Sequence, residues 1–167
     1  MRTECAVRRA IEAGNRPMQR INLGASTLES SRLVYGCMRI AGDNSAAERE
    51  RGKQAIQAAI ECGYNHFDHA DIYGGGACEE LFGEVLRESP GLRGDIILTS
   101  KCGIRLDDSP LSGDPKRYDF SSDYILASVD GSLERLGVET IDFYHLHSIR
   151  WSDYRRMSGR GKPLERF

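Results

Sequence analysis

Apolar residues in this chain fall into two alternating patterns. Residues 96–99 form a continuous apolar run of the kind that buried parallel strands show. Elsewhere apolar residues recur four positions apart, as with Ile56 and Ile60, which is typical of one face of a helix. Gly63 and Pro90 stand where such helices must end. The pattern predicts strands at 33–35, 65–68, 95–101 and 141–146, separated by helices at 46–62, 79–88 and 122–136.

Two segments depart from this alternation. Residues 19–33 alternate polar and apolar positions around Gly24, which predicts a short β-hairpin. Residues 103–120 are rich in Gly, Pro and Asp and are predicted to form a polar loop. The chain therefore divides into an extension at 1–17 that is expected to be disordered, a regular unit at 18–147, and a tail at 148–167.

The order of the predicted elements indicates an α/β fold. Strands alternating with helices build either an open doubly wound sheet or a (β/α) barrel. The dinucleotide fingerprint G-x-G-x-x-G is absent after the first strand, and the glycines at 74–76 lack its spacing, so the sequence favours the barrel. A barrel brings the C-terminal ends of its strands together on one face. Polar residues at those ends are therefore expected to meet.

Titratable side chains stand at three of these strand ends. Asp68 and Tyr73 follow the second predicted strand, Lys101 closes the third, and His147 closes the fourth. The phenol of a tyrosine is a weak acid, with an ordinary pKa of about 10, and a nearby ammonium group stabilises its anion. A carboxylate can hold that ammonium in place, and a histidine can hydrogen-bond a carbonyl oxygen. Together these groups suit the protonation of an alkoxide, the acid half of a carbonyl reduction whose hydride must come from a cofactor.

Several motifs, in order, give the chain a resemblance to a known family. From about Met18 to His147 it resembles the aldo-keto reductases, in particular their YdhF-like branch of bacterial oxidoreductases. The resemblance implies a (β/α)8 TIM barrel that reduces aldehyde or ketone carbonyls to alcohols with NADPH. The motifs are Tyr-Gly-Cys-Met-Arg at 35–39, Phe-Asp-His-Ala-Asp-Ile-Tyr-Gly at 67–74, Thr-Ser-Lys-Cys at 99–102, Ser-Leu-Glu-Arg-Leu-Gly at 132–137 and Ile-Asp-Phe-Tyr-His-Leu-His at 141–147.

The resemblance also implies roles for individual residues. Tyr73 would be the proton donor, Lys101 and Asp68 would tune it, and His147 would orient the substrate carbonyl. The residues near the nicotinamide ribose would be Cys37, Met38, Arg39 and Asp68.

The chain is short for such a barrel. A (β/α)8 barrel needs at least about 200 residues, whereas this chain has 167. The expected fold is a barrel truncated to about its first four β/α units, preceded by the hairpin. The half that in this family sets the choice between NADPH and NADH is missing, and no residue can be assigned to the 2'-phosphate. An isolated half barrel exposes strand edges and apolar faces, so we expect it to be inactive alone and to self-associate through those edges.

The tail differs in composition from the rest of the chain. Residues 148–167 carry six basic residues against two acidic ones and show no helical period. We interpret this segment as lying outside the family pattern, and a frameshift within a codon or two of His147 would explain it.

Composition narrows the setting in which the protein works. A net charge of −2 gives no reason to expect a nucleic-acid partner, and no apolar run approaches the roughly 18 residues of a membrane span. The five cysteines are odd in number and scattered, without a C-x-x-C pair, which fits a reducing cytoplasm better than a disulfide scaffold or a zinc site.

Two other functions compete with carbonyl reduction. A metal-dependent hydrolase could use His66, Asp68, His69 and Asp71, although strand alternation places only His66 and Asp68 on one face. A non-enzymatic fragment or interaction module could use the exposed edges. NADPH binding separates the second alternative from the reductase, and metal analysis separates the first.

Overall fold

The computed structural model describes residues 18–148, so the extension at 1–17 and residues 149–167 of the tail lie outside the described residues. The elements in chain order are β1 (Arg20–Asn22), β2 (Glu29–Ser31), β3 (Tyr35–Gly36), α2 (Ala46–Glu61), β4 (His66–Asp68), the 3₁₀ turn η1 (Tyr73–Gly76), α3 (Ala77–Glu88), α4 (Leu92–Asp95), β5 (Ile97–Cys102), β6 (Ile104–Arg105), β7 (Arg117–Tyr118), α5 (Ser122–Leu136) and β8 (Phe143–Leu146).

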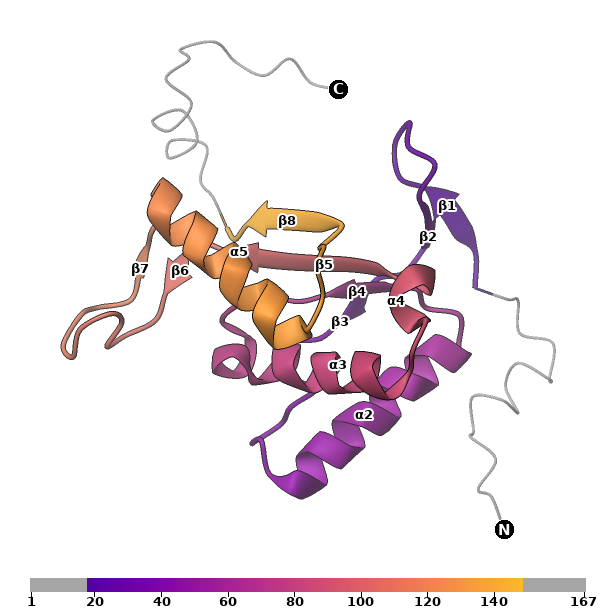
Figure 1. Ribbon diagram of the computed structural model, residues 1–167, viewed down its shortest axis with the longest axis horizontal. Helices are drawn as coiled ribbons and strands as arrows, with labels where there is room; N and C mark the ends of the chain where they lie inside the picture. Colours follow the sequence, from indigo (N-terminus) through magenta and orange to yellow (C-terminus); the bar gives the residue numbers. More distant parts are fainter. Residues whose placement is uncertain (1–17, 149–167) are drawn as a thin grey trace.

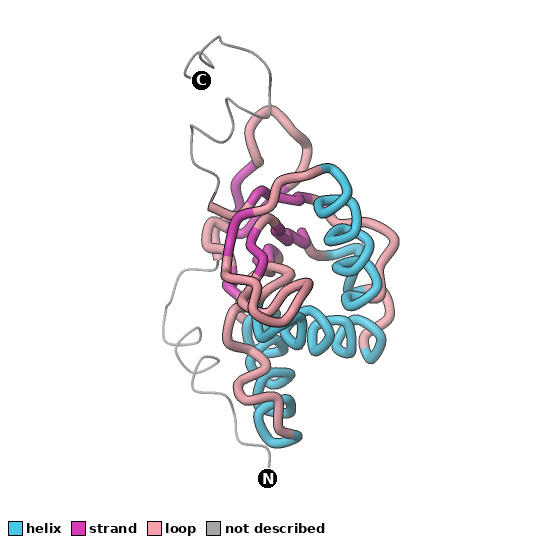
Figure 2. The backbone as a smooth tube through the Cα atoms, turned by 90° about the vertical axis from the view of Figure 1, so that its left-hand side faces the viewer, coloured by secondary structure: helices cyan, strands magenta, loops and turns pink. Residues whose placement is uncertain are grey.

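A four-stranded parallel sheet organises the molecule. Its strand order is β3-β4-β5-β8, and neighbouring strands pair in parallel register, with Asp68 opposite Thr99 and Lys101 opposite His145. The crossovers between these strands carry α2, α3 and α5 (Figure 1). All three helices lie on the same side of the strands (Figure 2). The described residues therefore form part of a β/α barrel, as the sequence predicted.

The β1–β2 hairpin is fastened to the start of β4. The two strands pair antiparallel, with Arg20 opposite Ser31. The backbone N–H of Ser31 donates to Oδ1 of Asn65 at 2.6 Å, and Nδ2 of Asn65 donates to the carbonyl of Glu29 at 2.9 Å. These bonds satisfy buried polar groups at the N-terminal end of the sheet, which is the end opposite the candidate site.

The core lies between the sheet and the helices. Phe67 of β4 is fully buried, and its ring lies 5.0 Å from that of Phe82 on α3. The predicted apolar face of α3 supplies Leu81, Phe82, Val85 and Leu86 to this core. Helix α2 contributes Ile56 and Ala59 and ends at Glu61, two residues before Gly63, whose φ of 89° lies in the left-handed region.

Three local expectations were wrong. Leu33 and Val34 were expected in a buried strand, but both are about half exposed, and β3 begins at Tyr35. Helix α3 begins at Ala77, two residues earlier than expected, because the glycine-rich turn η1 leads directly into it. The segment 103–120 is not wholly a loop, because β6 and β7 pair antiparallel within it.

One membrane-related finding concerns the described helices. Within residues 18–148, no helix combines the length and the apolar character that crossing a bilayer requires.

Helix α2 tolerates no side chain at Gly52. A Cβ atom there would lie 2.0 Å from the carbonyl oxygen of Ile40 and 2.6 Å from the side chain of Leu81. Gly52→Ala is therefore expected to lower the free energy of unfolding by about 1–3 kcal/mol, the usual cost of overpacking. The matched control is Gly94→Ala, since a Cβ atom at Gly94 meets nothing within 4 Å. Urea denaturation of both variants checks the prediction, and equal stability of the two would contradict this packing.

Candidate active site

The four candidate catalytic residues come from neighbouring strand ends. Asp68 is the last residue of β4, Tyr73 opens η1, Lys101 lies in β5, and His147 follows β8 directly. Because β4, β5 and β8 are adjacent and parallel, their C-terminal ends lie side by side at the same end of the sheet. The structure brings all four side chains into one cluster.

Lys101 is the centre of this cluster. Its Nζ donates to Oδ2 of Asp68 at 2.9 Å and lies 3.2 Å from the hydroxyl of Tyr73. It also donates to the backbone carbonyl of His69 at 2.6 Å. The Lys101 side chain is only 14% exposed, so its ammonium relies on these partners in place of water. Two acceptors, the Asp68 carboxylate and the His69 carbonyl, hold the charge beside the phenol oxygen, which is the third.

His147 packs against the same tyrosine. The two rings meet edge to face, with centroids 6.0 Å apart and an interplanar angle of 84°. Burial and the nearby charge of Lys101 lower the pKa of His147, although Asp68 opposes them. The imidazole is therefore neutral at physiological pH. Its Nδ1 is buried and makes no hydrogen bond to any described residue.

The predicted cofactor-binding residues at the end of β3 separate into two groups. The side chain of Cys37 is fully buried in the core, where burial, reinforced by Asp68, raises the pKa of its thiol well above the ordinary value. Met38 and Arg39 are exposed. The backbone N–H of Cys37 donates to the carbonyl of Asp68 at 2.9 Å, which fixes this segment beside the end of β4. Of these three side chains, only those of Met38 and Arg39 are exposed.

The residues of the alternative metal site point to different places. His66 uses both ring nitrogens within the protein, toward Ser30 at 3.0 Å and Thr99 at 2.8 Å. His69 is buried against Phe82 on the helix side, with ring centroids 4.7 Å apart, and burial together with Lys101 lowers its pKa to about 3. Within residues 18–148, no group of three His, Cys, Asp or Glu side chains is placed to hold a metal ion.

A buried ion pair supports the layer behind the cluster. Glu79 on α3 is fully buried and accepts from Nε of Arg135 on α5 at 2.8 Å. The same carboxylate accepts from the hydroxyl of Ser100 at 2.5 Å. Ser100 directly precedes Lys101, so this network ties two helices to the strand that carries the candidate lysine. No local pattern in the sequence indicates this network.

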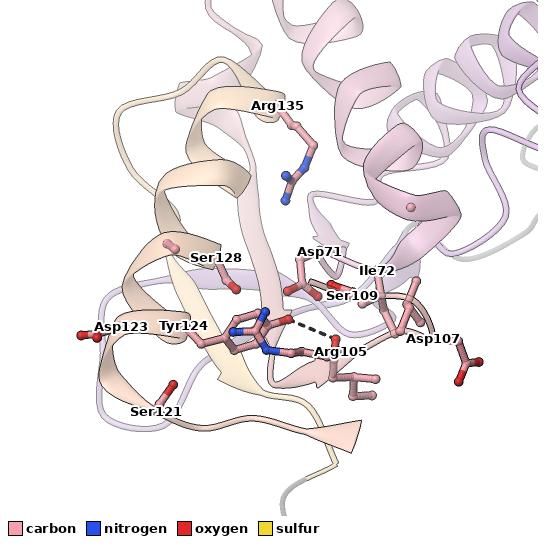
Figure 3. A pocket seen from close by; sticks show the side chains of 14 residues that line it. Asp71, Ile72, Arg105, Asp107, Ser109, Ser121, Asp123, Tyr124, Ser128 and Arg135 are labelled. Carbon is pink, nitrogen blue, oxygen red and sulfur yellow. Dashed lines mark hydrogen bonds between the residues drawn. The ribbon is translucent and has the colours of Figure 1, made fainter. Parts of the chain in front are cut away.

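One large cavity lies apart from the cluster. It has a volume of about 800 Å³ and lies among the start of α5, strand β6 and the loop before η1 (Figure 3). None of the four candidate residues lines it. Asp71, which the sequence analysis weighed only as a metal ligand, lies in its wall, and so do residues of the presumed loop such as Arg105.

We expect the Asp71 carboxyl group in the cavity wall to make the stability of the protein depend on pH. Burial, reinforced by Glu79, raises the pKa of Asp71 from 3.8 to about 6. The folded state therefore holds this proton more tightly than the unfolded state, and the free energy of unfolding falls as pH rises from about 3.8 to 6. Asp71→Asn should remove that fall and should stabilise the protein at neutral pH.

Asp119 supplies the control for this measurement. Burial opposes ionisation of Asp119, but hydrogen bonds from Ser121 and the Arg105 guanidinium outweigh it and lower the pKa to about 2. Asp119→Asn should therefore lower the free energy of unfolding at neutral pH, remove the part of its pH dependence that Asp119 causes between about pH 3.8 and 2, and leave the fall between about pH 3.8 and 6 intact. Urea denaturation across this pH range checks both variants. An unchanged slope in Asp71→Asn would contradict the assignment.

Comparison with known proteins identifies the family of the chain. The model of the aldo/keto reductase family matches residues 32–157. The chain is 44% identical over 132 residues to the uncharacterized oxidoreductase YcsN of Bacillus subtilis, and this match covers 78% of the chain and 43% of YcsN. It is 34% identical over 132 residues to the oxidoreductase YdhF of Escherichia coli, covering 78% of the chain and 43% of YdhF.

Structural comparison gives the same answer. The holo form of the aldo-keto reductase AKR11C1 from Bacillus halodurans is 34% identical, with a TM-score of 0.68, over 81% of this chain and 42% of that one. The chain belongs to the aldo/keto reductase family. It spans less than half the length of YcsN, YdhF and AKR11C1, and its described residues form part of the (β/α)8 barrel of that family.

Proposed function

We propose that this part of the chain supplies the acid–base half of an NADPH-dependent reduction of aldehydes or ketones to alcohols. One observation carries the proposal: Nζ of Lys101 contacts the Asp68 carboxylate and the Tyr73 hydroxyl at the same time. Membership of an oxidoreductase family supports it. The thiols Cys37, Cys78 and Cys102 are buried and form no disulfide, which fits a reducing cytoplasm.

The proton would leave from Tyr73. As hydride adds to a carbonyl carbon, negative charge grows on the oxygen, and the phenol O–H can donate to it. The ammonium of Lys101, 3.2 Å from that hydroxyl, stabilises the phenolate left behind. Asp68 and the His69 carbonyl hold the ammonium in position throughout the step. The geometry is preorganised, so little rearrangement is needed during reaction.

His147 would orient the substrate. Its neutral ring lies against Tyr73, and a neutral imidazole can donate one hydrogen bond. A carbonyl oxygen held by both the imidazole and the phenol would face its proton donor at the moment charge develops. The small-molecule partner of this site is thus a carbonyl compound.

The exposed side chains that follow β3 are the candidates for holding the cofactor. Bound NADPH supplies the hydride, which no protein side chain can provide. Met38 and Arg39 are exposed beside the end of β4 and would hold the cofactor together with Asp68, whereas the buried thiol of Cys37 would contribute only through its backbone. The residues present therefore fit a nicotinamide at this edge.

NADPH consumption in the presence of a simple aldehyde tests the proposal. The assay compares the 167-residue chain with a chimera in which residues 18–148 replace the matching segment of YcsN, which restores the length of its relatives. We expect aldehyde-dependent consumption by the chimera and little or none by the chain alone. A folded chimera that binds NADPH but reduces no carbonyl compound would overturn the proposal.

A second candidate role follows from the sheet edges. Within residues 18–148, β3 and β8 each have a strand neighbour on one side only. Unpaired edges are templates for pairing with another chain, so we propose self-association through them when the chain is present alone. Sedimentation of the isolated chain as a compact monomer with a cooperative melt would contradict this role.

A further inference from the structure

The cavity shown in Figure 3 belongs to the helix side of the sheet. Side chains alternate between the two faces of a strand. Lys101 faces the candidate site, and its neighbour Ser100 therefore faces α3, where it meets Glu79. The cavity wall includes Arg135, the partner of that same Glu79, which places the cavity on the helix-covered face.

The cavity arises because α5 diverges from α3 along its length. Near its C-terminal end α5 is in close contact with α3, since a Cβ atom on Gly83 would lie 2.4 Å from the carbonyl oxygen of Arg135. Toward its N-terminal end α5 leans away from α3 (Figure 1), and there Tyr124 donates to the carbonyl of Ile104 on β6 at 3.1 Å. Among the residues that the structure describes, those lining this cavity lie between positions 71 and 135.

The wall offers hydrogen-bond acceptors and donors side by side. The Asp71 carboxylate points toward Ser128 (Figure 3), and its Oδ1 makes no hydrogen bond to any described residue. The guanidinium of Arg105 lies 4.1 Å from the centre of the Tyr124 ring and is fixed through Nε to Asp119 at 2.6 Å. Further polar groups at the wall are Asp107, Ser109, Ser121, Asp123 and Arg135.

This mixture selects a particular kind of ligand. A hydroxyl group both donates and accepts hydrogen bonds, whereas an ammonium only donates and a carboxylate only accepts. A wall that mixes carboxylates, guanidinium groups and hydroxyls, with an aromatic ring beneath one guanidinium, matches a neutral ligand bearing several hydroxyls. We propose that this cavity is a binding site for a small polyhydroxylated molecule, a sugar or polyol, separate from the carbonyl-reduction site.

The test titrates the 167-residue chain with glucose and glycerol and follows the backbone amide signals of residues 104–106 and 124–128 by NMR. Ethylamine and acetate serve as singly charged comparison probes. Saturable shifts with glucose or glycerol, stronger than with either ion, support the proposal. Shifts with ethylamine alone or acetate alone, or no saturable shift with any probe, would overturn it.

Matched variants locate the binding. Ala127→Trp places a large ring into the cavity from an exposed turn of α5 and should weaken the affinity at least about tenfold. Leu126→Trp is the control, because Leu126 is exposed on the same helix and does not line the cavity. Equal affinity in both tryptophan variants would overturn the site.

A third variant separates this proposal from the proposed function. Tyr73→Phe should leave polyol affinity unchanged, because Tyr73 does not line the cavity. Loss of polyol binding in Tyr73→Phe with retention in Ala127→Trp would instead place the ligand at the carbonyl-reduction site. The cavity assignment would then fail while the reductase proposal would stand.

Discussion

Replacing Tyr73 with phenylalanine in the YcsN chimera is expected to lower kcat by about 10²–10⁴-fold, the usual contribution of a positioned general acid. The substitution removes one oxygen and leaves the ring, so the edge-to-face packing on His147 is retained. Substrate binding should weaken far less than turnover, since the lost interaction matters most when charge has developed on the carbonyl oxygen. Steady-state kinetics with an aldehyde measure both quantities.

The control for this result is another tyrosine. Tyr118 in β7 is about half exposed and stacks on Phe120, away from Lys101, so Tyr118→Phe should leave kcat unchanged. Lys101→Met should approach the defect of Tyr73→Phe, and the double variant should be little worse than either, because the two groups act as a unit. Wild-type turnover in Tyr73→Phe would remove Tyr73 from the mechanism.

Replacing Arg135 with methionine is expected to lower the free energy of unfolding by about 3–5 kcal/mol, the cost of leaving one member of a buried ion pair without its partner. Glu79 is fully buried and accepts hydrogen bonds from Arg135 and Ser100. Methionine retains much of the apolar stem of arginine but supplies no donor. The carboxylate would then have to remain charged in the core or take up a proton.

Two further variants make this measurement specific. Arg51→Met removes the partner of Glu48 from an ion pair in which Arg51 is 73% exposed, and should cost no more than about 1 kcal/mol. Adding Glu79→Gln to Arg135→Met should recover part of the lost stability, since the unpaired charge is removed. Urea denaturation of the unsubstituted chain and the three variants gives these values. A cost below about 1 kcal/mol for Arg135→Met alone would show that the network does not carry the buried charge.

Local sequence signals were sufficient for the regular elements. Helix α5 spans Ser122–Leu136 as predicted, because its apolar residues recur with helical spacing and Gly137 ends it in a left-handed conformation with a φ of 66°. The continuous apolar run before Lys101 likewise identified β5. These features depend on residues close in sequence, so the periodicity is enough.

Features set by distant pairing were not predictable in this way. Strands β6 and β7 have two residues each and exist only because Ile104 pairs with Tyr118 across the intervening loop. Leu33 and Val34 look apolar enough for a core strand, yet no described element covers them fully. A short apolar run does not show which distant segments of the chain will pack against it.

The candidate site shows the same division. The sequence predicted that Asp68, Tyr73, Lys101 and His147 lie at strand ends, and barrel topology was enough to expect them close together. It could not show that the backbone carbonyl of His69 is a third acceptor for Lys101, because every residue has a carbonyl. Nor could it show that Glu79 pairs with Arg135, since that contact depends on the packing of α3 against α5.

Transfer of deuterium from labelled NADPH tests the central claim most directly. The chimera would be supplied with NADPH deuterated at the transferable position of the nicotinamide, together with an unlabelled aldehyde. Mass spectrometry of the alcohol then reports the origin of the new C–H bond. We expect one deuterium in the alcohol, formed far more slowly in Tyr73→Phe. Unlabelled alcohol, or no alcohol from a folded chimera that binds NADPH, would contradict the assignment of this cluster to carbonyl reduction.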